Sequence, residues 1–262
     1  MGHTVRIRCT ALVALVAGAV LIASGSAAAA PAAVGASPGA PLIRIRASVQ
    51  RPGTTSTNWS GYGIGGTFGS VAGSWTVPVV SPSPSSTYSS TWIGIDGLAN
   101  KSLIQTGTES DSVGGHVVYD AWWEVLPAAE KVIVTLPVSP GDRMSATITQ
   151  LTGHKWTIVL SDLTSGHSFS HTRAYRGPAT SAEWIEERPQ LGRTLSTLAP
   201  FATTTFSGIR ANGADPNLTP ASAISMVSTT GTQVLASPST PSSLGDAFSV
   251  AYGPTAPPAP AG

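Results

Sequence analysis

The clearest strand in this sequence is the run Val117-Val118-Tyr119-Asp120-Ala121-Trp122-Trp123-Glu124-Val125. Valine, tyrosine and tryptophan favour extended backbone, because branched and aromatic side chains pack well on a pleated surface. Alternate residues of a strand share a face, so the side chains of Trp122 and Glu124 point to the same side. The run therefore predicts a strand that carries a tryptophan and a carboxylate together on one face.

Similar short runs occur elsewhere in the chain, separated by glycine, proline, serine and aspartate. They span residues 90–95, 131–136, 144–151, 155–160, 182–185, 203–209, 223–227 and 247–252. Turn signals such as Ser139-Pro140-Gly141-Asp142 recur at hairpin spacing, and no window shows a sustained helical period. We expect one all-β domain over residues 54–252, an antiparallel sandwich or barrel without internal repeats.

The composition limits the class of partner. The 262 residues include 14 basic and 13 acidic side chains, and only 10% are charged. Disordered polyelectrolytes, coiled coils and nucleic-acid binders with basic patches all need more charge than this. Five of the bases precede Gly53, which leaves nine bases against 13 acids in the body, a formal charge of −4. We therefore expect no nucleic-acid partner.

The first part of the chain has the layout of a secretory signal peptide. Arg6 and Arg8 form a positive end, residues 11–22 are apolar but short for a membrane span, and Ala28-Ala29-Ala30 offers a cleavage site. We expect residues 1–30 to be removed and the protein to be secreted, free of the membrane. The only cysteine, Cys9, would be lost with them. The mature protein would then have no disulfide, thiol nucleophile or thiolate metal ligand.

Two further segments differ from the body in composition. Residues 31–53 are rich in alanine, proline and glycine and carry Arg44, Arg46 and Arg51. Two interpretations remain open for them: a solvated linker, or a cleavable propeptide whose cations lie against an acidic cleft. Residues 253–262 form a tail of low complexity that we expect to be disordered.

Several familiar active sites lack their motifs here. Residues 54–252 contain no Gly-x-Ser-x-Gly, no His-Glu-x-x-His and no Gly-Lys-Ser/Thr, the signatures of α/β-hydrolases, common zinc peptidases and P-loop enzymes. His167 and His171 are four residues apart, but the surrounding serine and glycine favour strand or loop over helix. We expect solvated or hydrogen-bonded histidines there, with no metal and no other cofactor.

Carboxylates within apolar runs are more informative, because a charge in such a run needs a reason. Glu183 lies in the run 181–185, and alternation places Trp92 on the face of Asp96 in the run 92–97. Paired tryptophans and carboxylates on a sheet face suit a cleft that holds a polymer, either peptide or sugar. The alternative is that the tryptophans fill the core while the acids lie at strand ends, and side-chain parity alone does not choose between them.

Six motifs stand in order along the body. They are Asn58-Trp59-Ser60-Gly61-Tyr62, Trp92-Ile93-Gly94-Ile95-Asp96-Gly97, Leu103-Ile104-Gln105-Thr106-Gly107, Tyr119-Asp120-Ala121-Trp122-Trp123-Glu124, Pro140-Gly141-Asp142 and Ser181-Ala182-Glu183-Trp184-Ile185-Glu186. In this order the chain resembles the eqolisins, the secreted glutamic peptidases. The likeness continues through Leu198-Ala199-Pro200-Phe201 to the terminal strand near Phe248, so it covers nearly the whole body.

The resemblance implies a concanavalin-like sandwich of two large antiparallel sheets, with a concave cleft that binds an extended peptide. It also implies endopeptidase activity in acid, with polypeptides as substrates and Gln105 and Glu183 as the catalytic pair. The glutamate would act as general base and then as acid, and the glutamine amide would stabilise the oxyanion. We expect a monomeric enzyme.

Other residues are assigned by the same resemblance. Four of them match positions that line the cleft and bind substrate: Trp92, Asp96, Trp122 and Glu124. Glu186 and Glu187 lie close to Glu183 in sequence, and we expect them at the rim of the cleft.

Two other functions are compatible with these residues. A glycoside hydrolase on the same kind of sandwich would use Glu124 and Glu183 as its two carboxylates. A binding module without catalysis would use the tryptophans as a platform for its ligand.

Overall fold

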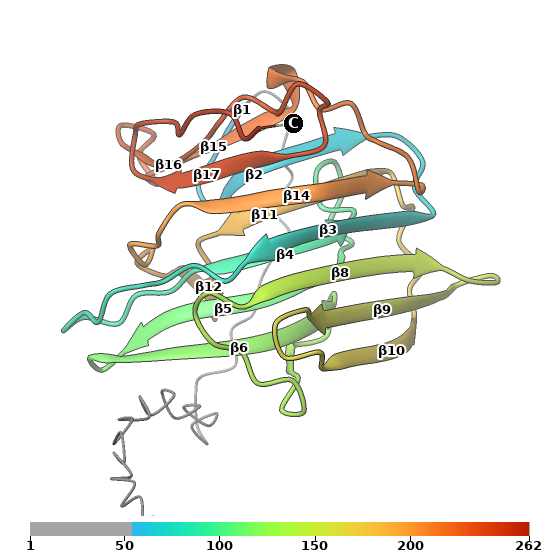
Figure 1. The fold of residues 1–262 in the computed structure, drawn as a ribbon, viewed down its shortest axis with the longest axis horizontal. Coiled ribbons are helices and arrows are strands. Elements are labelled where there is room, and N and C mark those ends of the chain that lie inside the picture. The colour runs from blue at the N-terminus through green and yellow to red at the C-terminus, as the bar shows by residue number, and fades with distance from the viewer. Residues whose placement is uncertain (1–53, 262) are drawn as a thin grey trace, which may run out of the picture. The chain divides into compact units, whose positions relative to one another are not determined.

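The computed structural model describes residues 54–261, and Figure 1 shows their fold. The predicted signal peptide, residues 1–30, and the predicted propeptide or linker, residues 31–53, lie outside the described residues. Within 54–261 the regular structure is β-strand except for one 3-10 turn, η1 (Pro220–Ser222). No helix in this part of the chain is long and apolar enough to cross a membrane.

Two antiparallel layers make up the fold. The front sheet in Figure 1 runs in the order β10 (Ser168–Ala174), β9 (Lys155–Asp162), β8 (Arg143–Gln150), β3 (Ser70–Thr76), β14 (Thr204–Ala211) and β17 (Phe248–Tyr252). The back sheet runs in the order β2 (Trp59–Gly65), β11 (Ser181–Glu187), β4 (Ser90–Ile95), β5 (Ile104–Val113), β6 (His116–Val125) and β7 (Lys131–Val132). This confirms the predicted all-β antiparallel sandwich.

One edge of the sandwich is closed by hydrogen bonds. β16 (Val234–Pro238) pairs with β17 of the front sheet, and β15 (Ala223–Val227) pairs with β2 of the back sheet. Since β15 and β16 also pair with each other, the ladder is continuous from one layer to the other. β1 (Thr54–Ser56) lies parallel to β15, and β12 (Gln190–Leu191) and β13 (Thr194–Leu195) form a separate small hairpin.

The core lies between the two sheets. Alternate residues of β8 and β9 point inward, and Met144, Ile148 and Ile158 are fully buried. Three tryptophans belong to this core, namely Trp75, Trp156 and Trp184. Buried indole N–H groups need acceptors, and Trp184 finds one in the backbone carbonyl of Ala72 at 2.8 Å.

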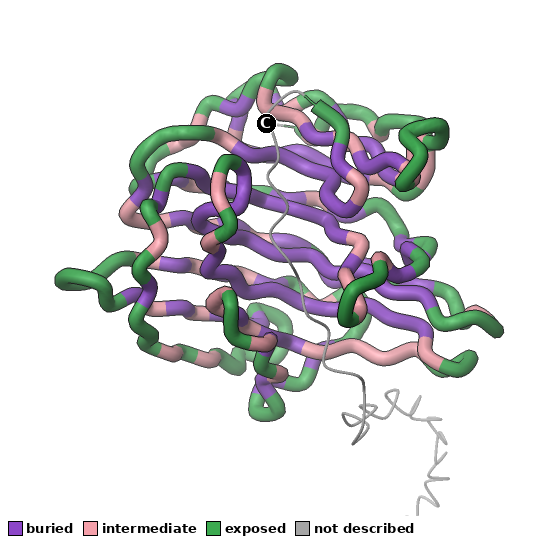
Figure 2. The backbone as a smooth tube through the Cα atoms, turned by 180° about the vertical axis from the view of Figure 1, so that it is seen from behind, coloured by how far each residue is buried: buried purple, intermediate pink, exposed green. Residues whose placement is uncertain are grey.

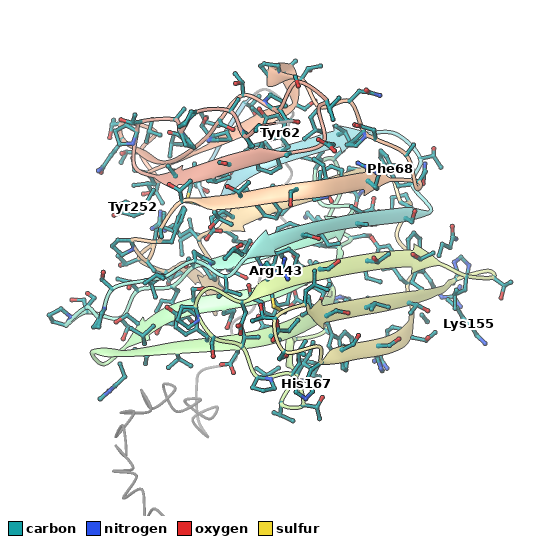
Figure 3. All side chains as sticks on the ribbon, viewed as in Figure 1. Tyr62, Phe68, Arg143, Lys155, His167 and Tyr252 are labelled. Carbon is teal, nitrogen blue, oxygen red and sulfur yellow. The ribbon has the colours of Figure 1, made fainter. Side chains whose placement is uncertain are left out.

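The outer face of the front sheet is polar and half-buried. Its residues in β8 and β9 are mainly serine and threonine, while Arg143 and Lys155 begin these strands at opposite ends of the pair, as Figure 3 shows. The back sheet differs, because β4 and β11 are buried along their whole length (Figure 2). Both faces of the back sheet are therefore covered, and one of them is not the sandwich core.

The strand predictions differ from the structure at a few places. Residues 90–95 and 223–227 coincide with β4 and β15. The predicted strand 131–136 is wrong beyond Val132, because the amide of Leu136 turns back to the carbonyl of Ile133. Residues 254–261 contain neither helix nor strand, and the preceding Gly253 donates to the carbonyl of Leu235.

Candidate active site

Three polar side chains lie in one row across the back sheet. Glu124 pairs with Gln105, Gln105 pairs with Gly94, and Gly94 pairs with Glu183. Residues directly opposite each other in antiparallel strands project to the same face. Glu124, Gln105 and Glu183 therefore share one face of the sheet. It is the face away from the sandwich core, since the next residue, Ile93, packs in that core.

Gly94 sets the spacing between Gln105 and Glu183. The two residues lie two strand spacings apart, which places their Cα atoms at about 10 Å. Because Gly94 has no side chain, the space between the Gln105 and Glu183 side chains is not filled from the strand beneath. A Cβ atom at Gly94 would lie 2.9 Å from Cζ3 of Trp92 and 3.1 Å from Cδ1 of Leu103. The row therefore requires glycine at this position if the indole of Trp92 is to keep its place.

Gln105 is held in one orientation by its neighbour in the row. Its Nε2 donates a hydrogen bond of 2.8 Å to Oε2 of Glu124. Its Oε1 is buried and has no hydrogen-bond partner among the described residues. A buried acceptor without a donor is unfavourable, so such atoms usually meet a water or a ligand. The amide thus keeps its carbonyl oxygen and one N–H hydrogen available.

Glu183 is also fully buried, and its carboxyl oxygens accept no hydrogen bond of normal geometry from the described residues. Burial raises the pKa of Glu183 well above the ordinary value, and the nearby charge of Asp96 acts in the same direction. Polar groups of Ser181 and Leu98 lower the pKa without offsetting the burial. The neutral carboxylic acid is the favoured form of Glu183 in this buried state.

The next row of the same face carries the tryptophans. Trp122, Gly107, Trp92 and Ile185 pair in sequence across β6, β5, β4 and β11. Trp59 meets the ring of Trp92 edge to face, with the centroids 5.1 Å apart. These three tryptophans form a hydrophobic cluster separate from the sandwich core. Six of the seven tryptophans are thus divided equally between the sandwich core and this second cluster, and Trp123 packs against the core while half-buried.

Asp96 lies just beyond the end of β4, at a φ of 72°. The strand, and with it the alternation of side chains that predicted Asp96 on the face of Trp92, ends at Ile95. Its carboxylate accepts hydrogen bonds from the Tyr175 hydroxyl and from the amides of Ala179 and Thr180, the latter two at 2.8 Å. Asp96 anchors the loop that leads into β11, and it acts on Glu183 through its charge.

The prediction that Glu186 and Glu187 lie at the rim of the cleft is wrong, because both are fully buried. Glu186 points to the sandwich core and accepts a hydrogen bond of 2.6 Å from the Thr91 hydroxyl. Glu187 shares the face of Glu183 and accepts hydrogen bonds from Nε1 of Trp92 at 2.7 Å and Nδ2 of Asn58 at 3.0 Å. Burial is the largest cause of the raised pKa of each carboxyl, which reaches about 8 for Glu186.

A second group of acids, which the sequence motifs did not indicate, lies on the same face. Glu109 pairs with Asp120, four residues along β5 and β6 from the Gln105–Glu124 pair. Glu109 and Glu130 share a side-chain hydrogen bond, and burial followed by their mutual repulsion raises the pKa of Glu109 well above its ordinary range. Strand parity would have placed Glu109 on the face of Gln105. Glu130 had no such signal, because it lies in a loop.

These acids are not arranged as a metal site in the part of the chain that the structure describes. Within residues 54–261, no three histidine, cysteine, aspartate or glutamate side chains are arranged to hold a metal ion. His171, four residues after His167 in the sequence, lies in β10, and its ring centroid is 4.5 Å from that of Trp123.

Comparison with known proteins matches this chain to a peptidase family and to two fungal proteins. The Peptidase A4 family matches residues 57–252. Aspergillopepsin-2 from Aspergillus niger is 30% identical over 196 residues, which cover 65% of this chain and 70% of that protein. Scytalidopepsin B from Scytalidium lignicola is 31% identical over 140 residues, about half of each chain, at 51% and 52%.

A solved structure agrees in fold. The crystal structure of scytalido-glutamic peptidase with a transition state analog inhibitor superposes with a TM-score of 0.64. The match covers 75% of this chain and 98% of that one, at 23% identity.

Proposed function

This chain belongs to the peptidase A4 family, and from that premise we propose that it cleaves polypeptides in acid through Gln105 and Glu183. Membership makes it a glutamic endopeptidase. The observation that supports the choice of residues is their placement on either side of Gly94, on one face, each with a buried oxygen that lacks a partner.

Glu183 supplies the proton transfers. A water held between the two side chains loses a proton to Glu183 as it attacks the peptide carbonyl, and Glu183 then gives that proton to the leaving nitrogen. A glutamate must be partly ionised to begin this cycle. When substrate and water relieve its burial, the main cause of the raised pKa of Glu183 is removed, and the pKa moves down toward the ordinary range of a glutamate. We therefore expect the reaction to be fastest at acidic pH.

Gln105 supplies an amide that Glu124 keeps in place. One Nε2 hydrogen goes to Glu124, the other points to the developing oxyanion, and Oε1 orients the water. Trp92 and Trp122 lie one row away and bind apolar side chains of the substrate. Asp96 acts indirectly, through its charge and through the loop that it anchors.

Burial of the pair supports a latent precursor. Gln105 and Glu183 have no exposed surface, so a peptide reaches them only after something is displaced. We propose that residues 31–53 act as a propeptide, with Arg44, Arg46 and Arg51 attracted to the carboxylates of this face, and that residues 1–30 direct secretion. Protonation of those carboxylates in acid weakens the attraction and favours release.

The glycoside hydrolase alternative receives less support. Glu124 and Glu183 are three strand spacings apart in the row, and Gln105 lies between them. Glu124 is also bound to Gln105. Neither this reading nor a binding module without catalysis explains the family to which the chain belongs.

The test is proteolysis of a denatured protein between about pH 3 and 5, the range in which a glutamate titrates. We expect Glu183→Gln to reduce cleavage to background and Gln105→Ala to reduce it by about 100-fold to 1,000-fold. Gln190→Ala, in the β12–β13 hairpin, is the matched control and keeps full activity. Full activity of Glu183→Gln would overturn the proposal, whereas loss in Glu124→Gln with only mild loss in Gln105→Ala would favour the glycosidase-like pair.

A further inference from the structure

A pocket opens at the edge of the sandwich opposite the one closed by β15 and β16. It lies between β6 and β7 of the back sheet and the end of β10 in the front sheet, and its volume is about 430 Å³. Pockets of this size commonly accept small molecules. It is distinct from the proposed catalytic row, because the side chains of Trp123 and Val125 point to the opposite face of β6 from Glu124.

The walls of the pocket are mainly apolar. Trp123 and Val125 come from β6, and Leu126 with the following proline and two alanines comes from the loop before β7. The ring of Trp123 is fixed by His171 of β10, with the two ring centroids 4.5 Å apart and the planes inclined by 33°. The contact joins the two sheets beside the pocket and keeps the indole in place as a rigid wall.

Two cations stand among the apolar wall residues. Lys131 and Arg173 both line the pocket and are exposed. Between residues 54 and 261 the structure contains one ion pair, Arg210 with Asp246, so neither pocket cation is neutralised by a carboxylate. No acidic residue lines the pocket. The body has nine bases and 13 acids, so its formal charge is negative. The pocket, with two bases and no acid, is locally positive.

We propose that this pocket binds a carboxylate that carries an apolar substituent. The carboxylate would accept hydrogen bonds from Lys131 and Arg173, and the apolar part would lie against Trp123, Val125 and Leu126. Arginine is well suited to this role, because its guanidinium presents parallel donors to both oxygens of a carboxylate. Two sources have this chemistry: a free fatty acid and the C-terminal residue of a peptide with an apolar side chain.

Leu126 connects the pocket to the other face of the back sheet. It packs against the tryptophan cluster of that face, and its amide donates to the carbonyl of Leu103, two residues before Gln105. A ligand in the pocket would therefore touch a residue that helps to cover the row of Gln105 and Glu183.

The experiment measures binding by the full-length chain carrying Glu183→Gln, so that the peptide probes stay intact if the proposed catalytic function is correct. Octanoate, octanamide, and an acetylated tripeptide ending in leucine as acid or amide are titrated near pH 5.5, where free carboxyls are ionised. Calorimetry and tryptophan fluorescence report binding. We expect octanoate or the peptide acid to bind, and both neutral amides to bind at least about tenfold more weakly.

Variants then locate the bound ligand. Lys131→Gln and Arg173→Gln are each expected to weaken binding about tenfold, while Arg193→Gln, an exposed base in the β12–β13 hairpin, leaves it unchanged. Binding of octanoate but not of the peptide acid identifies a free amphiphilic acid as the ligand, and the reverse identifies a peptide C-terminus. The proposal is overturned if no carboxylate binds, if the amides bind equally well, or if Arg193→Gln weakens binding as much as Lys131→Gln. None of these outcomes depends on the proteolysis result.

Discussion

Gln105 and Glu183 pair with the same residue, Gly94, from opposite sides of β4. Between the two residues, the middle strand contributes no side chain of its own at this row, because Gly94 has none. The amide and the carboxyl project to the same face on either side of Gly94, and the indole of Trp92 lies close to the Gly94 Cβ position. The register of three strands, and not the sequence position of either residue, places them in one row.

The glycine between the pair is expected to be essential. Gly94→Ala places a methyl group against Trp92 and Leu103, and such overpacking typically costs about 1 to 3 kcal/mol. Displacement of reacting groups by even 1 Å can reduce a rate by about 100-fold. We expect kcat/KM to fall by that order with a smaller loss of thermal stability. Gly65→Ala is the control, since nothing lies within 4 Å of its Cβ position, and equal losses in both variants would contradict the argument.

Glu186 is expected to make the fold less stable as the pH rises. Its pKa is about 8 in the folded protein against 4.5 in the reference state, so the folded chain binds the extra proton between these values. Stability from this group is therefore full below about pH 4.5 and falls up to about pH 8, by on the order of 5 kcal/mol in total. Glu186→Gln removes this dependence while Thr91 can still donate to the new amide oxygen.

Urea unfolding of this variant at pH 4, 6 and 8 measures the effect, with Asp215→Asn in a surface turn as the control. The decline with pH should be shallower in Glu186→Gln alone. A parallel decline in the variant and the wild type would show that Glu186 does not titrate in this range.

The acids at the far end of β5 and β6 should act in the same direction. Burial first, and repulsion between carboxyls second, raise the pKa values of Glu109 and Glu130. Both groups hold protons in the folded chain that they lose on unfolding near neutral pH, so the midpoint of thermal unfolding should fall between about pH 4 and 7. The double variant Glu109→Gln and Glu130→Gln should reduce this fall. A midpoint that rises with pH in the wild type would contradict the prediction.

Glu187 is expected to position Trp92, the tryptophan beside the proposed catalytic pair. Glu187→Ala leaves the indole N–H of Trp92 without its acceptor, at a cost of about 1 to 3 kcal/mol for a buried group, and removes one hydrogen bond of the Asn58 amide. We expect a lower unfolding temperature and a higher KM for peptides, with kcat less affected. Glu187→Gln retains one acceptor oxygen and should restore part of both. Equal behaviour of the two variants would argue against this role.

The proposed propeptide makes a separate prediction. Deletion of residues 31–53 should give a chain that cleaves peptides without a lag after transfer to acid, or a chain that expresses poorly because it folds without its propeptide. Replacement of Arg44, Arg46 and Arg51 by glutamine removes the proposed attraction to the carboxylates and should shorten the lag after transfer to acid. Time courses of peptide cleavage measure this. Unchanged expression and latency after the deletion would refute the propeptide.

Local patterns were sufficient for the all-β class and for the faces of single strands. Trp122 and Glu124 share a face as expected, because the side-chain period of a strand is set by its own backbone. The pattern failed where a strand ended earlier or later than expected. Asp96 lies beyond β4 with positive φ, and Glu187 lies within β11 under the tryptophan cluster instead of at a rim.

The sequence by itself therefore determined which residues could occupy one face of a given strand, and the family motifs indicated which of them to examine. Only the tertiary structure decided that β5 and β11 flank β4, that Gly94 lies between Gln105 and Glu183, and that Glu109, Asp120 and Glu130 gather at one end. The physical reason is that side-chain alternation follows from the local backbone, whereas the choice and register of neighbouring strands follow from burying apolar faces that are distant in the chain.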